Sequence, residues 1–201
     1  FPYTTLFRSG TDTNFSTHNI KACTSNDCAT GCVGAATDAA STSTISSLVN
    51  GTAYYACIQS VDLATNTSAF VASAATVTVD TTTPTGYSVA IDQTYINNGN
   101  RTAISFTFTG AEVGTTYNYT FSSTGGGTNV TGNGTVSSAG QQITGINLNG
   151  LGDGTVTLSV TLTDGAGNVG TAATNNKTKD TVLPVISAVS PTANFSNTNV
   201  S

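Results

Sequence analysis

The sequence has 201 residues, only 7% of them charged, and its formal net charge is −5. An acidic chain without a basic stripe argues against nucleic acid as a partner, since nucleic acid binds clustered Lys and Arg. No apolar run approaches the ~20 residues of a membrane-spanning helix, so we expect no span in this chain. Thr, Val and Ile recur in alternating runs, which favours β-strands.

The first nine residues, FPYTTLFRS, match the in-frame translation of a common sequencing-adapter oligonucleotide. They show no strand alternation or turn chemistry that joins them to the rest of the chain. We therefore interpret residues 1–9 as an artefactual adapter-derived segment and exclude them from the fold prediction.

A repeat with a period of about 100 residues, the size of one immunoglobulin-like sandwich, organises the rest of the chain. Residues 45–84 align with residues 143–184. Both segments run from an Ile-containing strand through a Gly-Thr turn, a long alternating strand and a D-x-A-x-N turn to a D-T-x-x-P exit. The acidic positions of the two copies correspond as Asp62 with Asp164 and Asp80 with Asp180.

The repeat predicts the domain organisation. Residues 10–82 are expected to be a first copy without its start, residues 83–182 a whole copy, and residues 183–201 the beginning of a third copy that is cut short. The whole copy is expected to contain seven strands, at residues 87–91, 103–109, 117–122, 130–136, 143–148, 155–162 and 169–178.

The strand pattern also predicts how the sheets pack. In residues 155–162, Val156, Leu158 and Val160 alternate with Thr or Ser, which indicates a strand with one buried face. Parallel sheets need crossover helices, and the sequence has no helical periodicity to supply them. We therefore expect antiparallel sheets packed face to face.

Residues 48–58, LVNGTAYYACI, resemble the E–F corner and F strand of fibronectin type III domains. The resemblance implies that Tyr54 is a structural corner residue whose hydroxyl binds nearby backbone, with Ala56 and Ile58 facing the core. The second copy has Thr155 and Val156 where that Tyr would stand, and it resembles a generic bacterial immunoglobulin-like repeat. The fold class implied is all-β, with tandem antiparallel immunoglobulin-like or fibronectin III-like sandwiches.

All four cysteines belong to the first copy, which predicts two disulfides and an oxidising, extracellular compartment. Their spacing does not match that of a zinc knuckle. In the fold that the sequence resembles, strand C (residues 20–23 here) neighbours strand F, and Cys57 projects away from the core. This favours Cys23–Cys57 with Cys28–Cys32, and Cys32–Cys57 with Cys23–Cys28 stays open as the alternative.

Calcium is the candidate cofactor. The turn and exit carboxylates recur at equivalent repeat positions, and hard cations bind carboxylates, turn carbonyls and Asn amides. A turn Asp and an exit Asp at one pole of a sandwich would then share an ion that stiffens the joint between domains. The competing interpretation is that each Asp caps its own turn through backbone amides. The candidate ligands are Asp62, Asp80, Asp164 and Asp180.

Reactive side chains are scarce. The single histidine, His18, stands in a polar stretch and is expected to be a solvated surface residue. Glu112 is the only Glu, and no second carboxylate lies near it in sequence for paired acid–base chemistry. Serine-hydrolase, zinc-protease and phosphate-loop motifs are missing from the sequence. We therefore predict that this segment is not an enzyme.

Two function classes fit these features. The first is a structural or adhesive segment of a bacterial cell-surface or secreted protein that acts as a stalk or spacer. Its partners would be the neighbouring repeats, with any cell-surface or matrix ligand bound by other domains. The alternative is a carbohydrate- or protein-binding accessory module of a secreted enzyme. Grouping of Tyr87, Tyr95 or Tyr117 on an exposed face would favour the alternative.

Overall fold

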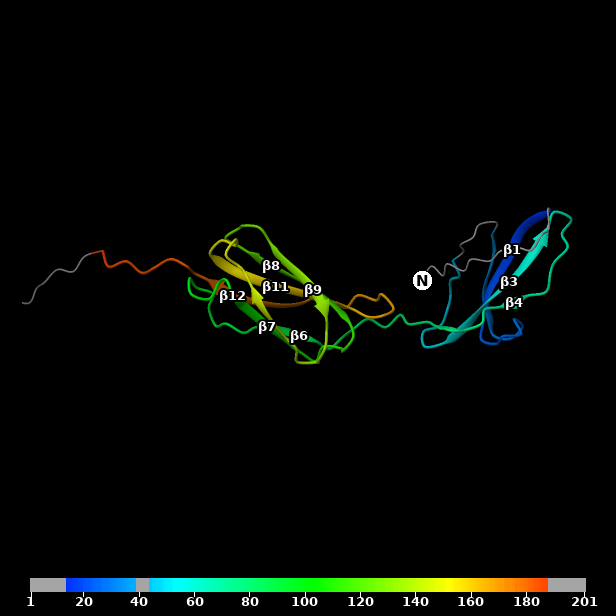
Figure 1. Cartoon of the computed structure of the whole chain (residues 1–201), viewed down its shortest axis with the longest axis horizontal. Helices are drawn as coiled ribbons and strands as arrows, with labels where there is room; N and C mark the ends of the chain where they lie inside the picture. Colours follow the sequence, from blue (N-terminus) through cyan, green and yellow to red (C-terminus); the bar gives the residue numbers. More distant parts are fainter. Residues whose placement is uncertain (1–13, 39–43, 188–201) are drawn as a thin grey trace, which may run out of the picture. The chain divides into compact units, whose positions relative to one another are not determined.

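The computed structural model describes residues 14–38 and 44–187. This part of the chain is all-β, and its strands pair in antiparallel ladders (Figure 1). It contains no helix long and apolar enough to cross a membrane. The chain divides into unit 1, Phe1–Thr83, and unit 2, Pro84–Ser201. The adapter-like residues 1–9 and residues 188–201 of the expected third copy lie outside the described ranges.

Unit 2 is a two-sheet sandwich. One sheet has the order β10-β7-β6 and the other has the order β12-β11-β8-β9. The strands are β6 (Ser88–Ile91), β7 (Ile104–Thr109), β8 (Thr116–Ser123), β9 (Val130–Thr135), β10 (Gln142–Ile146), β11 (Gly154–Thr163) and β12 (Ala173–Lys179). All seven expected strands are present. The last one begins at Ala173 because residue 169 forms only an isolated bridge to Thr163.

The core of unit 2 lies between its sheets. Along β11, Val156, Leu158, Val160 and Leu162 are fully buried, and the residues between them are not. This confirms the predicted period of two. Phe106 and Phe108 of β7 meet this face from the other sheet. Burial of a large apolar side chain contributes roughly 1.5–3 kcal/mol, so each side chain of this layer stabilises unit 2 substantially.

The glycines of β9 are required by aromatic side chains on β8. Gly132 pairs with Tyr119 and Gly134 with Tyr117, and a Cβ at either glycine would overlap the ring opposite. Tyr119 also lies edge-on to Phe106, with 5.5 Å between ring centroids. These glycines do weaken strand propensity, but they make room for tyrosines that complete the core.

In the part of unit 1 that the structure describes, the strands form one sheet of order β2-β1-β3-β4, with β5 also paired to β3. The strands are β1 (Phe15–Cys23), β2 (Cys32–Asp38), β3 (Ala53–Asp62), β4 (Val71–Ala72) and β5 (Val77–Thr78). A small apolar cluster of Ala22, Tyr54 and Val79 is buried in this unit. Cys23, Cys28 and Cys57 form a second cluster.

Candidate functional site

The turn carboxylates are engaged by their own turns. In unit 1, Asp62 accepts hydrogen bonds from the backbone amide of Asn66 at 2.7 Å and from its side-chain amide at 2.8 Å. In unit 2, Asp164 accepts the same pair from Asn168, at 2.9 and 2.8 Å. The Asn side chains lower the pKa of both carboxyl groups. Each D-x-A-x-N turn therefore engages both oxygens of its carboxylate in hydrogen bonds within the turn.

The exit carboxylates also cap local backbone. Asp80 accepts from the amide of Thr82 at 2.9 Å, and Asp180 accepts from the amide of Val182 at 3.0 Å. In the described ranges, no group of three or more His, Cys, Asp or Glu side chains is placed to hold a metal ion. The calcium site thus stays a prediction without a ligand cluster to support it.

The expectation that a turn Asp and an exit Asp share one pole of a sandwich is wrong within each unit. Asp62 ends β3, whereas the segment before Asp80 pairs at the start of β3, where Val79 donates to the carbonyl of Thr52. Ten strand residues at ~3.3 Å each separate the two ends. Asp164 and Asp180 are separated in the same way by β11.

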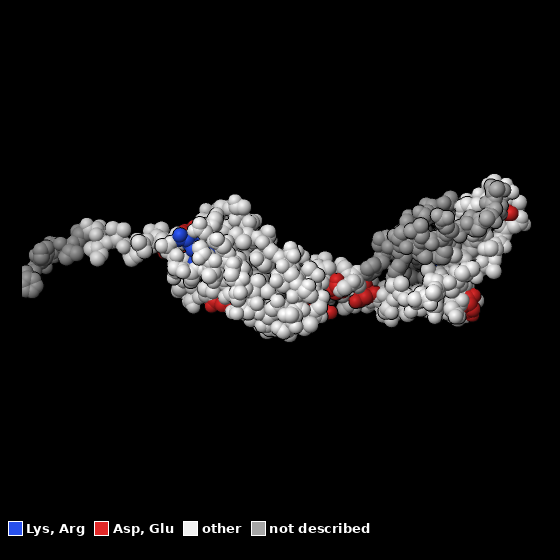
Figure 2. Space-filling model, viewed as in Figure 1, with Lys and Arg blue, Asp and Glu red and all other residues white. Residues whose placement is uncertain are grey.

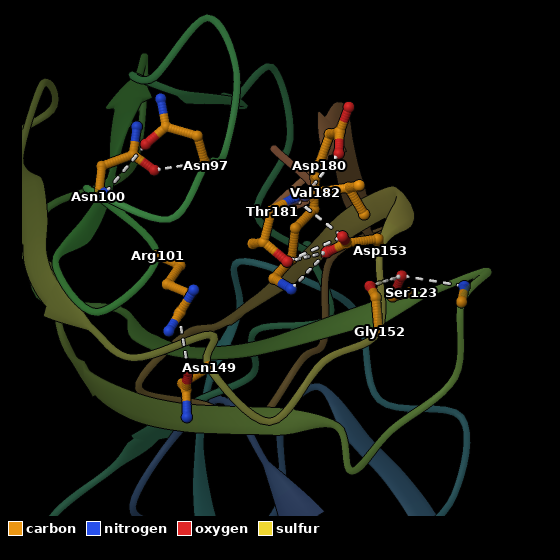
Figure 3. A network of polar contacts seen from close by, with 12 residues as sticks. Asn97, Asn100, Arg101, Ser123, Asn149, Gly152, Asp153, Asp180, Thr181 and Val182 are labelled. Atoms are coloured by element: carbon orange, nitrogen blue, oxygen red, sulfur yellow. Dashed lines mark hydrogen bonds and ion pairs between the residues drawn. The ribbon is translucent and has the colours of Figure 1, made fainter. Parts of the chain in front are cut away.

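A polar network that sequence reasoning missed lies where the chain leaves unit 2 (Figure 3). Asp153, in the turn before β11, accepts from the ammonium group of Lys179 at 2.8 Å. Its other carboxylate oxygen accepts from the backbone amide and the hydroxyl of Thr181, both at 2.8 Å. The bond from Lys179, followed by those from Thr181, lowers the pKa of Asp153 to about 2. Lys179 itself is 4% exposed, so Asp153 is the counter-charge of a buried ammonium.

An open hollow of about 440 Å³ adjoins this network. Arg101 lies on its wall and donates to the side-chain carbonyl of Asn149 at 2.7 Å. The wall carries a guanidinium and an ammonium group but no Ser, Cys or His that could serve as nucleophile or base. Its full lining is Arg101, Asn149, Leu151, Gly152, Asp153, Lys179 and Thr181.

Unit 1 contains the counterpart of this network. The side-chain carbonyl of Asn50 accepts from the amide of Thr81 at 2.8 Å, and its amide group donates to the hydroxyl of Thr82 at 2.9 Å. Asn50 and Asp153 each precede the Gly-Thr pair of the repeat. Aligning the two Gly-Thr pairs would have identified them. We call the contact between this turn side chain and the exit segment the exit latch.

The disulfides are Cys23–Cys32 and Cys28–Cys57, so both expected pairings are wrong. Cys23 and Cys32 lie directly opposite one another in the β1–β2 ladder, with 4.0 Å between their Cα atoms. Cys28, in the loop between these strands, reaches Cys57. The sequence did not reveal that β1 and β2 form a hairpin, and Cys23 lies opposite Tyr55 rather than Cys57.

Tyr54 lies where the sequence predicted a corner residue, whereas His18 is not on the surface. The hydroxyl of the buried Tyr54 accepts a hydrogen bond from the amide of Val49 at 3.3 Å, which is the corner contact implied by the fibronectin resemblance. His18 is not solvated, which corrects the sequence expectation. It is 7% exposed, with its ring 4.5 Å from that of Phe15 and its Nδ1 3.4 Å from the hydroxyl of Ser60.

No family model matches the chain, and no curated protein is similar enough to count as a relative. Among solved structures, a tetra-tandem repeat in the extending region of a large adhesion protein is similar, with 23% identity and a TM-score of 0.37. The alignment covers 82% of this chain and 41% of that one. The FN1–FN3 domains of chicken CNTN1 give 12% identity and a TM-score of 0.48, covering 83% of this chain and 56% of theirs. The chain thus spans less than two thirds of either solved chain, and neither similarity says what it does.

Proposed function

We propose that this chain is a non-catalytic spacer, a run of sandwich repeats that holds other parts of an extracellular, bacterial surface protein apart. The observation that carries the proposal is that both units anchor the chain next to their junction. Unit 1 holds Thr81 and Thr82 through Asn50. In unit 2, the hydroxyl of Tyr87 donates to the carbonyl of Thr171 at 2.6 Å. Only residues 83–86 lie between these anchors, and Pro84 fixes one of their φ angles.

The disulfides of unit 1 and the few charges on the surface are consistent with an extracellular spacer. The two disulfides of unit 1 favour an oxidising environment such as the outside of a cell, because structural disulfides are rare where thiols are kept reduced. The face shown in Figure 2 carries few charged side chains.

The accessory-module alternative receives no support from the aromatic side chains. Tyr117 is buried against Phe108, and the hydroxyl of Tyr87 is used inside unit 2. Of the three, only Tyr95 is largely exposed, at 65%. A sugar site built on stacked rings needs several exposed rings on one face.

The test is ¹⁵N relaxation of the full chain, with the two units read separately. A spacer requires amides of both units to report one anisotropic tumbling motion. A variant with six Gly-Ser residues inserted between Thr83 and Pro84 provides the flexible reference, because such linkers behave as random coils. If the unmodified chain gives the same relaxation as this variant, the units move independently and the spacer proposal fails.

A further inference from the structure

The exit latch makes the same backbone contact in both units, with an uncharged side chain in unit 1 and a carboxylate in unit 2. In unit 1 the amide of Thr81 donates to an uncharged Asn50 oxygen at 2.8 Å. In unit 2 the amide of Thr181 donates to an Asp153 carboxylate oxygen, also at 2.8 Å. The next amide along the chain is capped in both units by the exit carboxylate, Asp80 or Asp180. Two consecutive backbone amides are therefore held by side chains at the point where the chain leaves each unit.

The residue before the exit Asp changes together with the latch residue. It is Val79 in unit 1 and Lys179 in unit 2, and both are buried, at 6% and 4% exposure. A buried ammonium needs a carboxylate, because leaving such a charge unpaired is costly. A buried Val needs no counter-charge, so an Asn suffices as its companion. Asn with Val and Asp with Lys are thus two self-consistent ways to build the same contact.

We infer that the turn residue and the residue before the exit Asp form a matched pair, whose role is to bind the exit backbone and fix the direction in which the chain leaves each unit. Asn50 and Asp153 are positioning residues for the exit segment. Lys179 supplies the positive charge that pairs with the carboxylate of Asp153. This inference deepens the spacer proposal and rests on it for its biological purpose, although the latch can be measured on its own.

Amide hydrogen exchange on the full chain tests the latch in unit 1. In N50A the amide of Thr81 loses its acceptor, and its protection should fall by about two- to tenfold. The matched control is N66A, which removes a side-chain hydrogen bond of similar length at the opposite end of β3. Equal protection of Thr81 in N50A and N66A would overturn the inference.

Replacing the Asp–Lys combination of unit 2 by the Asn–Val combination of unit 1 tests the pairing of Asp153 with Lys179. D153N alone leaves Lys179 buried without its carboxylate, so it should lower the melting temperature of unit 2 markedly. The double variant D153N/K179V recreates the combination found in unit 1 and should recover most of that loss, while Thr181 stays protected. A double variant that melts no higher than D153N, or that leaves Thr181 unprotected, would contradict the matched pair.

Different experimental outcomes would reject the exit latch and the spacer role. Loss of Thr81 protection in N50A, in a chain whose units already tumble independently, would keep the latch and reject the spacer. Units that tumble together equally well in wild type and N50A, with Thr81 equally protected in both, would keep the spacer and reject the latch.

Discussion

The hydroxyl of Tyr87 accepts a hydrogen bond from the amide of Leu162, 75 residues further along the chain, at 3.2 Å. The same hydroxyl donates to the carbonyl of Thr171. One side chain near the start of unit 2 thus connects the end of β11 to the segment that leads into β12. A Cβ at Gly170 would press against this hydroxyl and overlap the carbonyl of Pro84, so the glycine is part of the same arrangement.

We expect Y87F to destabilise unit 2 by about 1–3 kcal/mol, because it leaves the amide of the buried Leu162 without its partner. Denaturant unfolding followed by far-ultraviolet circular dichroism measures the change. The control is Y95F, since the side chain of Tyr95 is 65% exposed and its loss of a hydroxyl should be neutral. A Y87F chain as stable as Y95F would show that the Tyr87 contacts contribute nothing.

The disulfide pairing gives a second prediction. Cleavage before Asp27 and Asp38 leaves Cys28 and Cys32 on one peptide, which should remain joined to both neighbouring cysteine peptides. Fragmentation of that peptide between Cys28 and Cys32 then assigns each bond by mass spectrometry. Release of the Asp27 peptide as a separate, internally bridged species would mean Cys28–Cys32 and would contradict the structure.

Reduction should affect the two units differently. Chain-entropy arguments assign roughly 3–4 kcal/mol to the Cys28–Cys57 loop, which spans 29 residues, and somewhat less to the shorter Cys23–Cys32 loop. Unit 1 has only a small apolar cluster in its described residues, so reductant should unfold it at a much lower temperature. Unit 2 contains no cysteine and should melt unchanged, which makes it the internal control.

The features that were predictable are those with a regular period. Alternation of Val and Leu with Thr along β11 reveals a half-buried strand whatever its partners are. Burial of His18 was not predictable, because it depends on Phe15 and Ser60, which approach it only after the sheet has formed. The latch was missed for a different reason. Asn50 and Asp153 both bind the exit backbone, but only Asp153 is a carboxylate. Comparing the repeated carboxylates alone therefore does not reveal that the two residues are equivalent.

Calcium should leave the melting temperature unchanged. Asp62 and Asp164 each accept hydrogen bonds on both carboxylate oxygens within their own turns, and in the described ranges neither joins a group of three His, Cys, Asp or Glu side chains that could hold an ion. Thermal melts in calcium and in chelator make the comparison. A cation that binds only the folded chain at a hundredfold excess over its Kd would add ~2.7 kcal/mol, a shift that is easily seen. N168A should lower the melting temperature of unit 2 equally with and without calcium, and a loss confined to calcium would restore the ion hypothesis.

Acid should release the latch of unit 2 and spare that of unit 1. The pKa of Asp153 is lowered to about 2 by Lys179 and Thr181, below the ordinary value near 3.8. A carboxyl group with a depressed pKa in the folded state stabilises the fold at pH values above its unfolded pKa. That contribution is lost as the pH falls from about 4 towards about 2.

The amide signal of Thr181 should therefore shift with a midpoint near pH 2 in ¹H–¹⁵N spectra. The amide of Thr81 should show no such transition, because its partner Asn50 does not titrate. In D153N/K179V the transition of Thr181 should disappear as well. Its persistence in that variant would show that a group other than Asp153 causes the transition, and the charge of Asp153 would then play no part in holding the exit segment of unit 2.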